Sequence, residues 1–292
     1  MQFWIERYEL FHNAILAALC AGLVCPLLGA FLYVRRTSFY GITLPQFATA
    51  GVALGFVVLP WWAERVGIGG LDPVTAQSDT HAAMNYHVTW AALFTFGGLL
   101  LLDWRARRSG NDVGRVAAAF AIAVAATYLF SRYSPIGASF VGELTEGEVL
   151  GVGEHELHTI AWLLGSVAAL FVLFHRDLTL ISFDREMAQV LGVRVVALET
   201  LLTLVTGLTI SVGTMTLGPT ILFGLLVLPP IAARAWATSM TRYLLLSSAF
   251  GAMSVLLGIA ASFQFDWPLG PAVVAAAALV HVPGLSLRRS AR

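Results

Sequence analysis

The chain contains no lysine, and only 12% of its 292 residues are charged. A soluble domain carries about twice that fraction of charged residues. Hydrophobic residues make up 58% of the chain and occur in runs long enough to span a membrane as helices. The shortage of charge therefore excludes a soluble globular domain and predicts an all-α, polytopic protein of the cell (inner) membrane.

Other absences exclude particular activities. The formal net charge is zero, so the chain lacks the basic surface by which proteins bind nucleic acid. It has no GxxxxGK[ST] loop, so we expect it neither to hydrolyse ATP nor to bind a cofactor of its own. Its two cysteines, Cys20 and Cys25, are five positions apart in one apolar run and point to different helix faces, which predicts neither a disulfide nor a metal pair.

The apolar runs predict about eight or nine transmembrane helices in a single domain, residues 1–292. The candidate spans are roughly 11–34, 42–59, 87–103, 115–131, 158–175, 196–213, 216–237, 243–263 and 270–287. Only Thr214 to Thr216 separate the sixth and seventh candidates, so these two helices are expected to be antiparallel neighbours. Pro229 and Pro230 predict a kink or partial unwinding in the seventh.

The arginines predict the orientation of these helices. Fourteen of the seventeen fall on one side: Arg35, Arg36, Arg105, Arg107, Arg108, Arg115, Arg176, Arg185, Arg194, Arg234, Arg242, Arg288, Arg289 and Arg292. Only Arg7, Arg65 and Arg132 fall on the other. Because basic residues accumulate in cytoplasmic loops, the arginine-rich side is predicted to be cytoplasmic. The outer side then carries two long loops, Pro60–Tyr86 and the acidic Ser131–Leu157.

The segment Phe183–Val195, FDREMAQVLGVRV, lies on the predicted cytoplasmic side between two apolar runs. Asp184 can cap a helix start, and Met187, Val190 and Leu191 give that helix one apolar face. Gly192 can end it, because glycine adopts the left-handed conformation easily. The pattern predicts a two-turn surface helix. It either shields the end of the bundle or forms a rigid contact on which another protein can push.

Charged residues near the middle of the predicted spans are scarce. Glu199 lies near the cytoplasmic end of its span, and Asp266 lies near an outer turn. Ion-coupled carriers place titratable groups inside the bundle. The pattern therefore argues against a proton- or sodium-driven carrier and favours energy supplied by a partner.

Several polar residues are candidates for binding. Glu154, His155 and His158 could share a metal in one outer loop, and His81 and His87 could contribute from the other, although ordinary solvated loops explain both sets. The order EHELH is not HExxH, so a zinc protease is not predicted. An intramembrane enzyme would also need a catalytic set, and no Ser/His/Asp spacing suggests one.

The second span offers a different candidate, a transport pathway. Ile42 and Gln46 share one helical face that is otherwise lined by small residues, and Thr49 lies beside it. Gln46 could contact a solute, or it could hydrogen-bond a neighbouring helix. Both interpretations stay open on the sequence.

Six motifs occur in order along the chain. They are YVRR-x-S-x-YG, xTLxxxxxxGVALGF, GEVLGVGEHEL, FDREMAQVLGV, LFGLLVLPPIAARAW and FDWPLGPAVV. As an ordered set, from about Ile15 to Leu279, the chain resembles the permease subunit of the ABC-3 family of ABC transporters, which import zinc, manganese or iron. FDREMAQVLGV matches the family's cytoplasmic FDxExAxxxG segment, and LGPAVV matches its last outer turn.

The resemblance implies a homodimeric permease with two kinds of partner: a separate ATPase subunit, which binds ATP on the cytoplasmic side, and an extracytoplasmic solute-binding protein. It also implies that residues 183–195 are a coupling helix that contacts the ATPase. The residues carried over to this role are Asp184, Arg185, Glu186, Met187, Gln189 and Gly192.

The chain departs from the family pattern at one place. The family usually reads GD-x-L-x-HA at the start of the second span, where Asp and His four apart can ligate a metal together. Here Ile42 replaces the Asp and Gln46 replaces the His. Ile42 cannot ligate a metal, and a neutral amide is a poor ligand for a transition metal. The expected function is a divalent-metal import permease. An ABC permease for a non-metal solute or for export, and a stand-alone secondary transporter, are the alternatives.

Overall fold

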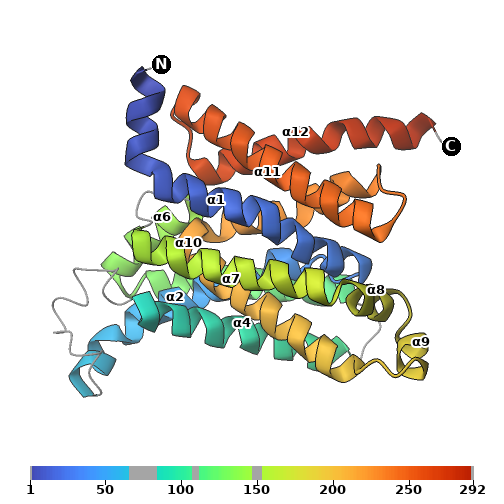
Figure 1. Cartoon of the computed structure of the whole chain (residues 1–292). Helices are drawn as coiled ribbons and strands as arrows, with labels where there is room; N and C mark the ends of the chain where they lie inside the picture. The colour runs from blue at the N-terminus through green and yellow to red at the C-terminus, as the bar shows by residue number, and fades with distance from the viewer. Residues whose placement is uncertain (1, 66–83, 107–111, 147–152, 291–292) are drawn as a thin grey trace.

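Helices account for every regular element that the computed structural model describes, in residues 2–65, 84–106, 112–146 and 153–290 (Figure 1). They are α1 (Gln2–Val34), α2 (Tyr40–Arg65), α4 (Met84–Ala106), α5 (Asp112–Ser131), α6 (Pro135–Glu146), α7 (Glu154–Leu173), α8 (His175–Phe183), α9 (Arg185–Val190), α10 (Val195–Arg234), α11 (Met240–Phe265) and α12 (Leu269–Ser290). The predicted all-α fold is confirmed.

The long helices match the predicted spans. Among the described residues, five helices are long and apolar enough to cross a membrane: α1, α2, α5, α10 and α11. The bent pair α7–α8 makes a sixth, and α4 and α12 contain shorter apolar helices. Each of the nine candidate spans falls on one of these helices, which supports a multi-pass membrane protein.

Helix α10 has 40 residues. As one straight helix it would be about 60 Å long at 1.5 Å per residue, about twice the thickness of the hydrocarbon core. It is broken at Gly218, whose φ of 81° and ψ of 155° are not helical. A Cβ added to Gly213 would lie 2.5 Å from Leu222 Cδ1, so the chain folds back at the break. Helix α10 is therefore two antiparallel segments, as predicted for the sixth and seventh spans.

The position of that turn was predicted wrongly. Thr214 to Thr216 are helical, and the break comes later, at Gly218 followed by Pro219. The Thr216 hydroxyl donates to the carbonyl of Val212 at 3.1 Å, so its hydrogen bond is made within the helix and needs no turn. Helical dihedral angles also continue through Pro229 and Pro230, so the partial unwinding predicted there is not observed.

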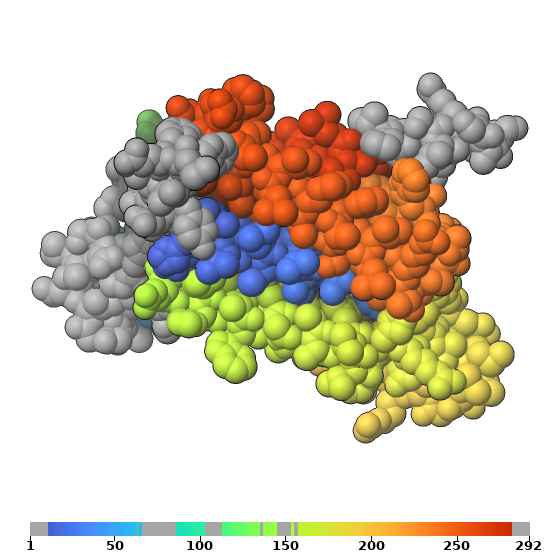
Figure 2. All heavy atoms as spheres, turned by 45° about the horizontal axis from the view of Figure 1, so that its top comes forward, coloured from blue at the N-terminus to red at the C-terminus, as the bar shows by residue number. Residues whose placement is uncertain are grey.

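Helix α1 lies between α11 on one side and α7 on the other (Figure 2), and it also packs on α10. Glycines allow its neighbours to approach its backbone. A Cβ added to Gly29 would lie 2.0 Å from the carbonyl oxygen of Leu226 in α10. A Cβ added to Gly251 of α11 would lie 2.2 Å from the carbonyl oxygen of Gly22. Small residues at helix contacts allow the close packing by which helices associate in membranes.

The acidic outer segment Ser131–Leu157 is not the simple loop expected from its sequence. Residues 135–146 form α6, which contacts α2 and α10. Val141 and Leu144, three residues apart, are both buried. This apolar face turns the segment inward, against the outer end of α2.

At the opposite end, α7 and α8 meet at an angle of 74°. Buried Leu178 and Ile181 fix α8 against the bundle. His175 Nε2 lies 3.2 Å from the Thr241 hydroxyl of α11, which adds a polar contact at the start of α8. Helix α9 follows α8 after a single residue, Asp184, and projects at one corner of the molecule (Figures 1 and 2).

Candidate coupling surface and transport pathway

Helix α9 is capped at both ends by side-chain and backbone contacts. The Asp184 carboxylate accepts a hydrogen bond from the Met187 backbone N–H at 2.8 Å. At the other end Gly192 has a φ of 79°, and the Val193 N–H donates to the carbonyl of Ala188 at 3.0 Å. The predicted short helix is confirmed, with its helical residues limited to Arg185–Val190. Both caps form within the segment, so its shape is fixed locally.

The apolar side chains of this segment point away from the rest of the chain. Val190 is 82% exposed, Leu191 is 64% exposed and Met187 is 50% exposed, whereas Ala188 is fully buried. The helix therefore rests on Ala188 and presents a large apolar face outward. Contiguous apolar surface that is not covered by its own chain is typical of a protein contact.

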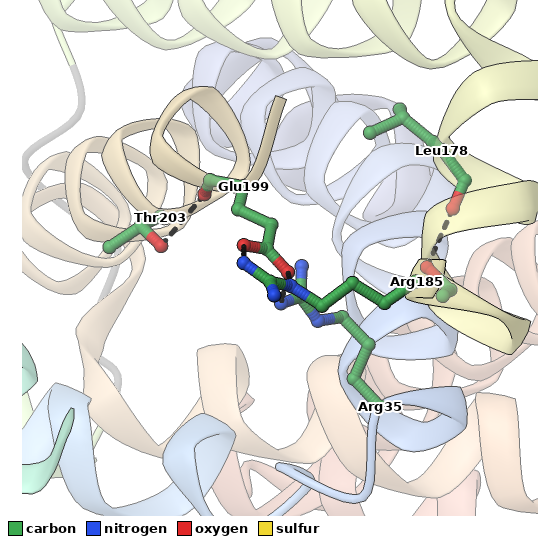
Figure 3. Close-up of polar contacts among 6 residues, drawn as sticks. Arg35, Leu178, Arg185, Glu199 and Thr203 are labelled. Atoms are coloured by element: carbon green, nitrogen blue, oxygen red, sulfur yellow. Dashed lines mark hydrogen bonds and ion pairs between the residues drawn. The ribbon is translucent and has the colours of Figure 1, made fainter. Parts of the chain in front are cut away.

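Two arginines from different elements meet on Glu199 at the start of α10 (Figure 3). The Arg185 guanidinium of α9 donates to the carboxylate through Nε at 3.2 Å and through Nη2 at 3.3 Å. Arg35, which directly follows α1, donates to the same carboxylate at 3.4 Å. Glu199 thus links the surface helix to α1 and α10, two helices of the bundle core.

The hydrogen bond and charge of Glu199 raise the pKa of the Arg185 guanidinium, so Arg185 stays protonated at any physiological pH. The side chains of Arg35 and Glu199 are 27% and 25% exposed, so water screens this contact only in part. Arg185 was predicted as a coupling residue, whereas Arg35 and Glu199 were not. Residues 35 and 199 are 164 positions apart, so only the tertiary fold reveals the contact.

The predicted pathway residues lie in the first turns of α2. Ile42 and Gln46 are half-buried, and Thr49 is fully buried. The Thr49 hydroxyl donates to the carbonyl of Pro45 at 2.9 Å, so it is engaged within its own helix. Helix α2 itself packs against α4, α5 and α10.

A second polar feature comes from the first segment of α10, which contacts α2 and α4. Thr206 and Ser211 are buried, and each donates its hydroxyl to a carbonyl of α10. The hydroxyls of Thr209 and Thr214 are buried and have no hydrogen-bond partner in the described part of the chain. These two groups are available to a solute or to a bound water.

The outer metal candidates that the structure describes lie in different surroundings. His81 lies outside the described residues, as does the side chain of His155, whereas Glu154 and His158 are exposed at the start of α7. His87 was predicted to lie in an outer loop, and this was wrong: it is fully buried in α4. Its ring stacks on Phe56 at 4.0 Å between centroids, with Phe140 of α6 at 6.3 Å. Within the described ranges, no three His, Cys, Asp or Glu residues are grouped to hold a metal ion.

Comparison with known proteins identifies the family. Residues 7–288 match the model of the ABC 3 transport family. The chain belongs to the ABC 3 transport family. The resemblance inferred from the six motifs is thereby confirmed, and with it an ABC-transporter permease fold embedded in the membrane by several apolar helices.

Individual relatives within the ABC 3 family are distant but extend over almost the whole chain. The manganese import system permease protein ScaB of Streptococcus pneumoniae is 24% identical over 94% of this chain and 89% of its own. The chelated iron transport system membrane protein YfeD of Yersinia pestis is 24% identical over 95% of this chain and 85% of its own. Among solved structures, PsaBC from Streptococcus pneumoniae in complex with Fab matches with a TM-score of 0.77 at 20% identity, covering 97% of this chain and 94% of that one.

Proposed function

We propose that the chain is the permease subunit of an ATP-driven importer of a divalent metal ion such as manganese or iron. Two copies form the pathway, an ATPase subunit binds α9, and a solute-binding protein docks on the outer face. ATP binds the ATPase partner, and the permease carries no cofactor. The metals are those in the names of ScaB and YfeD.

The observation that supports ATPase coupling most strongly is the construction of α9. It is rigid because both ends are capped, and it exposes the apolar side chains of Met187 and Val190. It is also joined through Arg185 and Glu199 to α1 and α10. A displacement of the exposed face of α9 would therefore be transmitted to α1 and α10 and not absorbed by a flexible loop.

The metal ion would bind only weakly as it passes through the permease. Along α2 the pathway face presents Ile42, Gln46 and Thr49, with one neutral amide and no carboxylate or imidazole. Such a face favours passage over tight binding, because a neutral carbonyl is a weak ligand for a transition metal. Selection of the metal would then fall to the solute-binding protein.

The test is reconstitution of the permease with its ATPase in liposomes, with uptake of manganese measured with and without ATP. Manganese accumulation that requires both the ATPase and ATP supports the proposal. Failure of the ATPase to co-purify, together with full uptake by the permease alone, would instead identify a secondary transporter.

Ile42 and Gln46 favour one other candidate, an ABC permease for a non-metal solute. Both replace the metal-binding residue types expected from the family pattern. A deletion strain that takes up manganese, iron and zinc normally, while losing another solute, would identify this alternative.

A further inference from the structure

A cavity of about 680 Å³ opens on the arginine-rich side of the bundle, beside α8. Its walls come from the end of α1, the turn into α2, the last residue of α8 and the connection between α10 and α11. The lining includes Arg36, Phe183, Arg234, Ala237, Ser239 and Met240. It is separate from the Glu199 contact and from the predicted pathway face of α2.

The polar chemistry of this cavity is that of an anion site. Arg36 and Arg234 supply two guanidinium groups, and the described lining includes no Asp or Glu. Within the described part of the chain, neither arginine has an ion-pair partner. Guanidinium groups bind phosphate through paired, charge-assisted hydrogen bonds.

The start of α11 adds positive electrostatic potential to that of the two arginines. Ser239 caps the helix, which runs 26 residues from Met240, and its hydroxyl accepts from the Arg242 backbone N–H at 3.3 Å. The positive end of the helix dipole therefore faces the cavity wall that Ser239 and Met240 form. Helix N-termini favour phosphate groups for the same reason.

Tyr243 forms part of the cavity wall, and its side chain is 3% exposed. Its hydroxyl is buried and has no hydrogen-bond partner among the described residues. The ring therefore shapes the wall, and the polar chemistry of the cavity comes from the two arginines and the start of α11.

The backbone at Arg36 is a second unusual feature. Arg36 has a φ of 60°, in the left-handed region at the end of α1, where glycine is the usual residue. The Thr37 N–H donates to the carbonyl of Leu32 at 2.9 Å and fixes this turn. An arginine held in a conformation that costs free energy is explained if its side chain is needed at the cavity.

The surroundings favour a lipid over a soluble anion. Phe183 at the cavity edge is 68% exposed. Trp236, next to the lining residue Ala237, is also exposed, as is common where helices meet the headgroup region. Basic pockets between transmembrane helices on the cytoplasmic side are suited to phospholipid headgroups.

We infer that this cavity binds the phosphate group of an anionic phospholipid of the cytoplasmic leaflet. Arg36 and Arg234 hold the phosphate, and the acyl chains pass the exposed Phe183 at the cavity edge. The bound lipid would join α1, α8 and α11 next to the surface helix α9. The inference concerns the permease alone and does not depend on which solute it moves.

The test measures lipid binding to the purified full-length permease by native mass spectrometry, with phosphatidylglycerol and phosphatidylcholine titrated separately. Wild-type permease should bind phosphatidylglycerol more tightly. The double variant Arg36→Gln/Arg234→Gln should lose about tenfold or more of that affinity, as expected for charge-assisted hydrogen bonds.

The matched control is Arg176→Gln/Arg242→Gln, which removes the same charge from exposed positions of α8 and α11 that do not line the cavity. It should bind phosphatidylglycerol like the wild type. Equal affinity in the cavity variant and the control would overturn the inference. Two other results would also overturn it: displacement of lipid by millimolar inorganic phosphate, which indicates a soluble anion, and loss of ATPase binding with lipid affinity unchanged, which indicates a protein contact.

Discussion

The two ends of the bundle are held together in different ways. At the end predicted to be cytoplasmic, Arg35 and Arg185 meet on Glu199, and α9 is capped but exposes its apolar face. At the end predicted to be outside, α2, α4 and α6 meet through the rings of Phe56, His87 and Phe140, and neither nitrogen of His87 has a hydrogen-bond partner among the described residues.

The difference indicates which end is built to move. Ion pairs that are partly exposed can break and reform at low cost, because water compensates the separated charges. A buried aromatic cluster loses dispersion contacts whenever it opens. We therefore expect the end that carries α9 to move when the ATPase acts on it. We expect the opposite end to stay closed until that movement occurs.

The largest expected effect comes from Glu199→Ala, which leaves Arg35 and Arg185 facing each other without a carboxylate. Because this carboxylate joins α9 to both α1 and α10, its loss should lower ATP-driven uptake by about 30-fold, within the usual range of coupling between sites. The measurement is uptake by the permease reconstituted with its ATPase. Glu143→Gln, an exposed acid on outer helix α6, is the control and should transport normally. Normal uptake by Glu199→Ala would show that the contact is not part of coupling.

The next effect tests the exposed face itself. Replacing Glu186 and Met187 by Ala should weaken ATPase coupling by about tenfold, equivalent to about 1.4 kcal/mol, while the permease still inserts. ATPase activity stimulated by the permease is the readout. Met253→Ala, a half-exposed methionine on α11, serves as the control. Unchanged stimulation in the double variant would remove the coupling role of α9.

The outer end gives a stability prediction of opposite sign. His87→Phe keeps a ring against Phe56 and removes two buried polar atoms that have no partner, each of which costs about 1–3 kcal/mol. The variant should therefore unfold at a higher temperature in detergent. His87→Ala, in contrast, should unfold at a lower temperature because it leaves a cavity. A phenylalanine variant less stable than the wild type would contradict this account of the outer end.

The smallest effect concerns the cap of α9. Asp184→Ala removes the acceptor for the Met187 N–H and should destabilise the short helix by about 1 kcal/mol. Hydrogen exchange of residues 185–190 would report the loss as faster exchange. Asp184→Asn retains a good capping side chain and should exchange like the wild type. Equal exchange rates for all three proteins would show that tertiary contacts, not the cap, hold α9.

The features predicted correctly from the sequence are those fixed by nearby residues. Asp184 and Gly192 cap α9 within ten residues of chain, and each apolar run became a helix because its backbone must satisfy itself in lipid. The features that were missed depend on distant parts of the chain. Glu199 and Arg35 meet only after folding, and α6 is stabilised by burial of Val141 and Leu144 against other helices, despite its acidic residues.

His87 shows the limit of residue type as a signal. A histidine beside a polar segment suggested a metal ligand, but its helix turns it into the cluster with Phe56 and Phe140. The roles of Ile42, Gln46 and Thr49 in a pathway, and of α9 in ATPase coupling, stay predictions.

Transport by the purified permease alone tests the central claim most directly. The chain is reconstituted in liposomes with and without the ATPase, and manganese accumulation is followed under an imposed proton or sodium gradient and after addition of ATP. The account predicts accumulation against the manganese gradient only when both the ATPase and ATP are present on the α9 side. Accumulation driven by an ion gradient in the permease-only liposomes would contradict it.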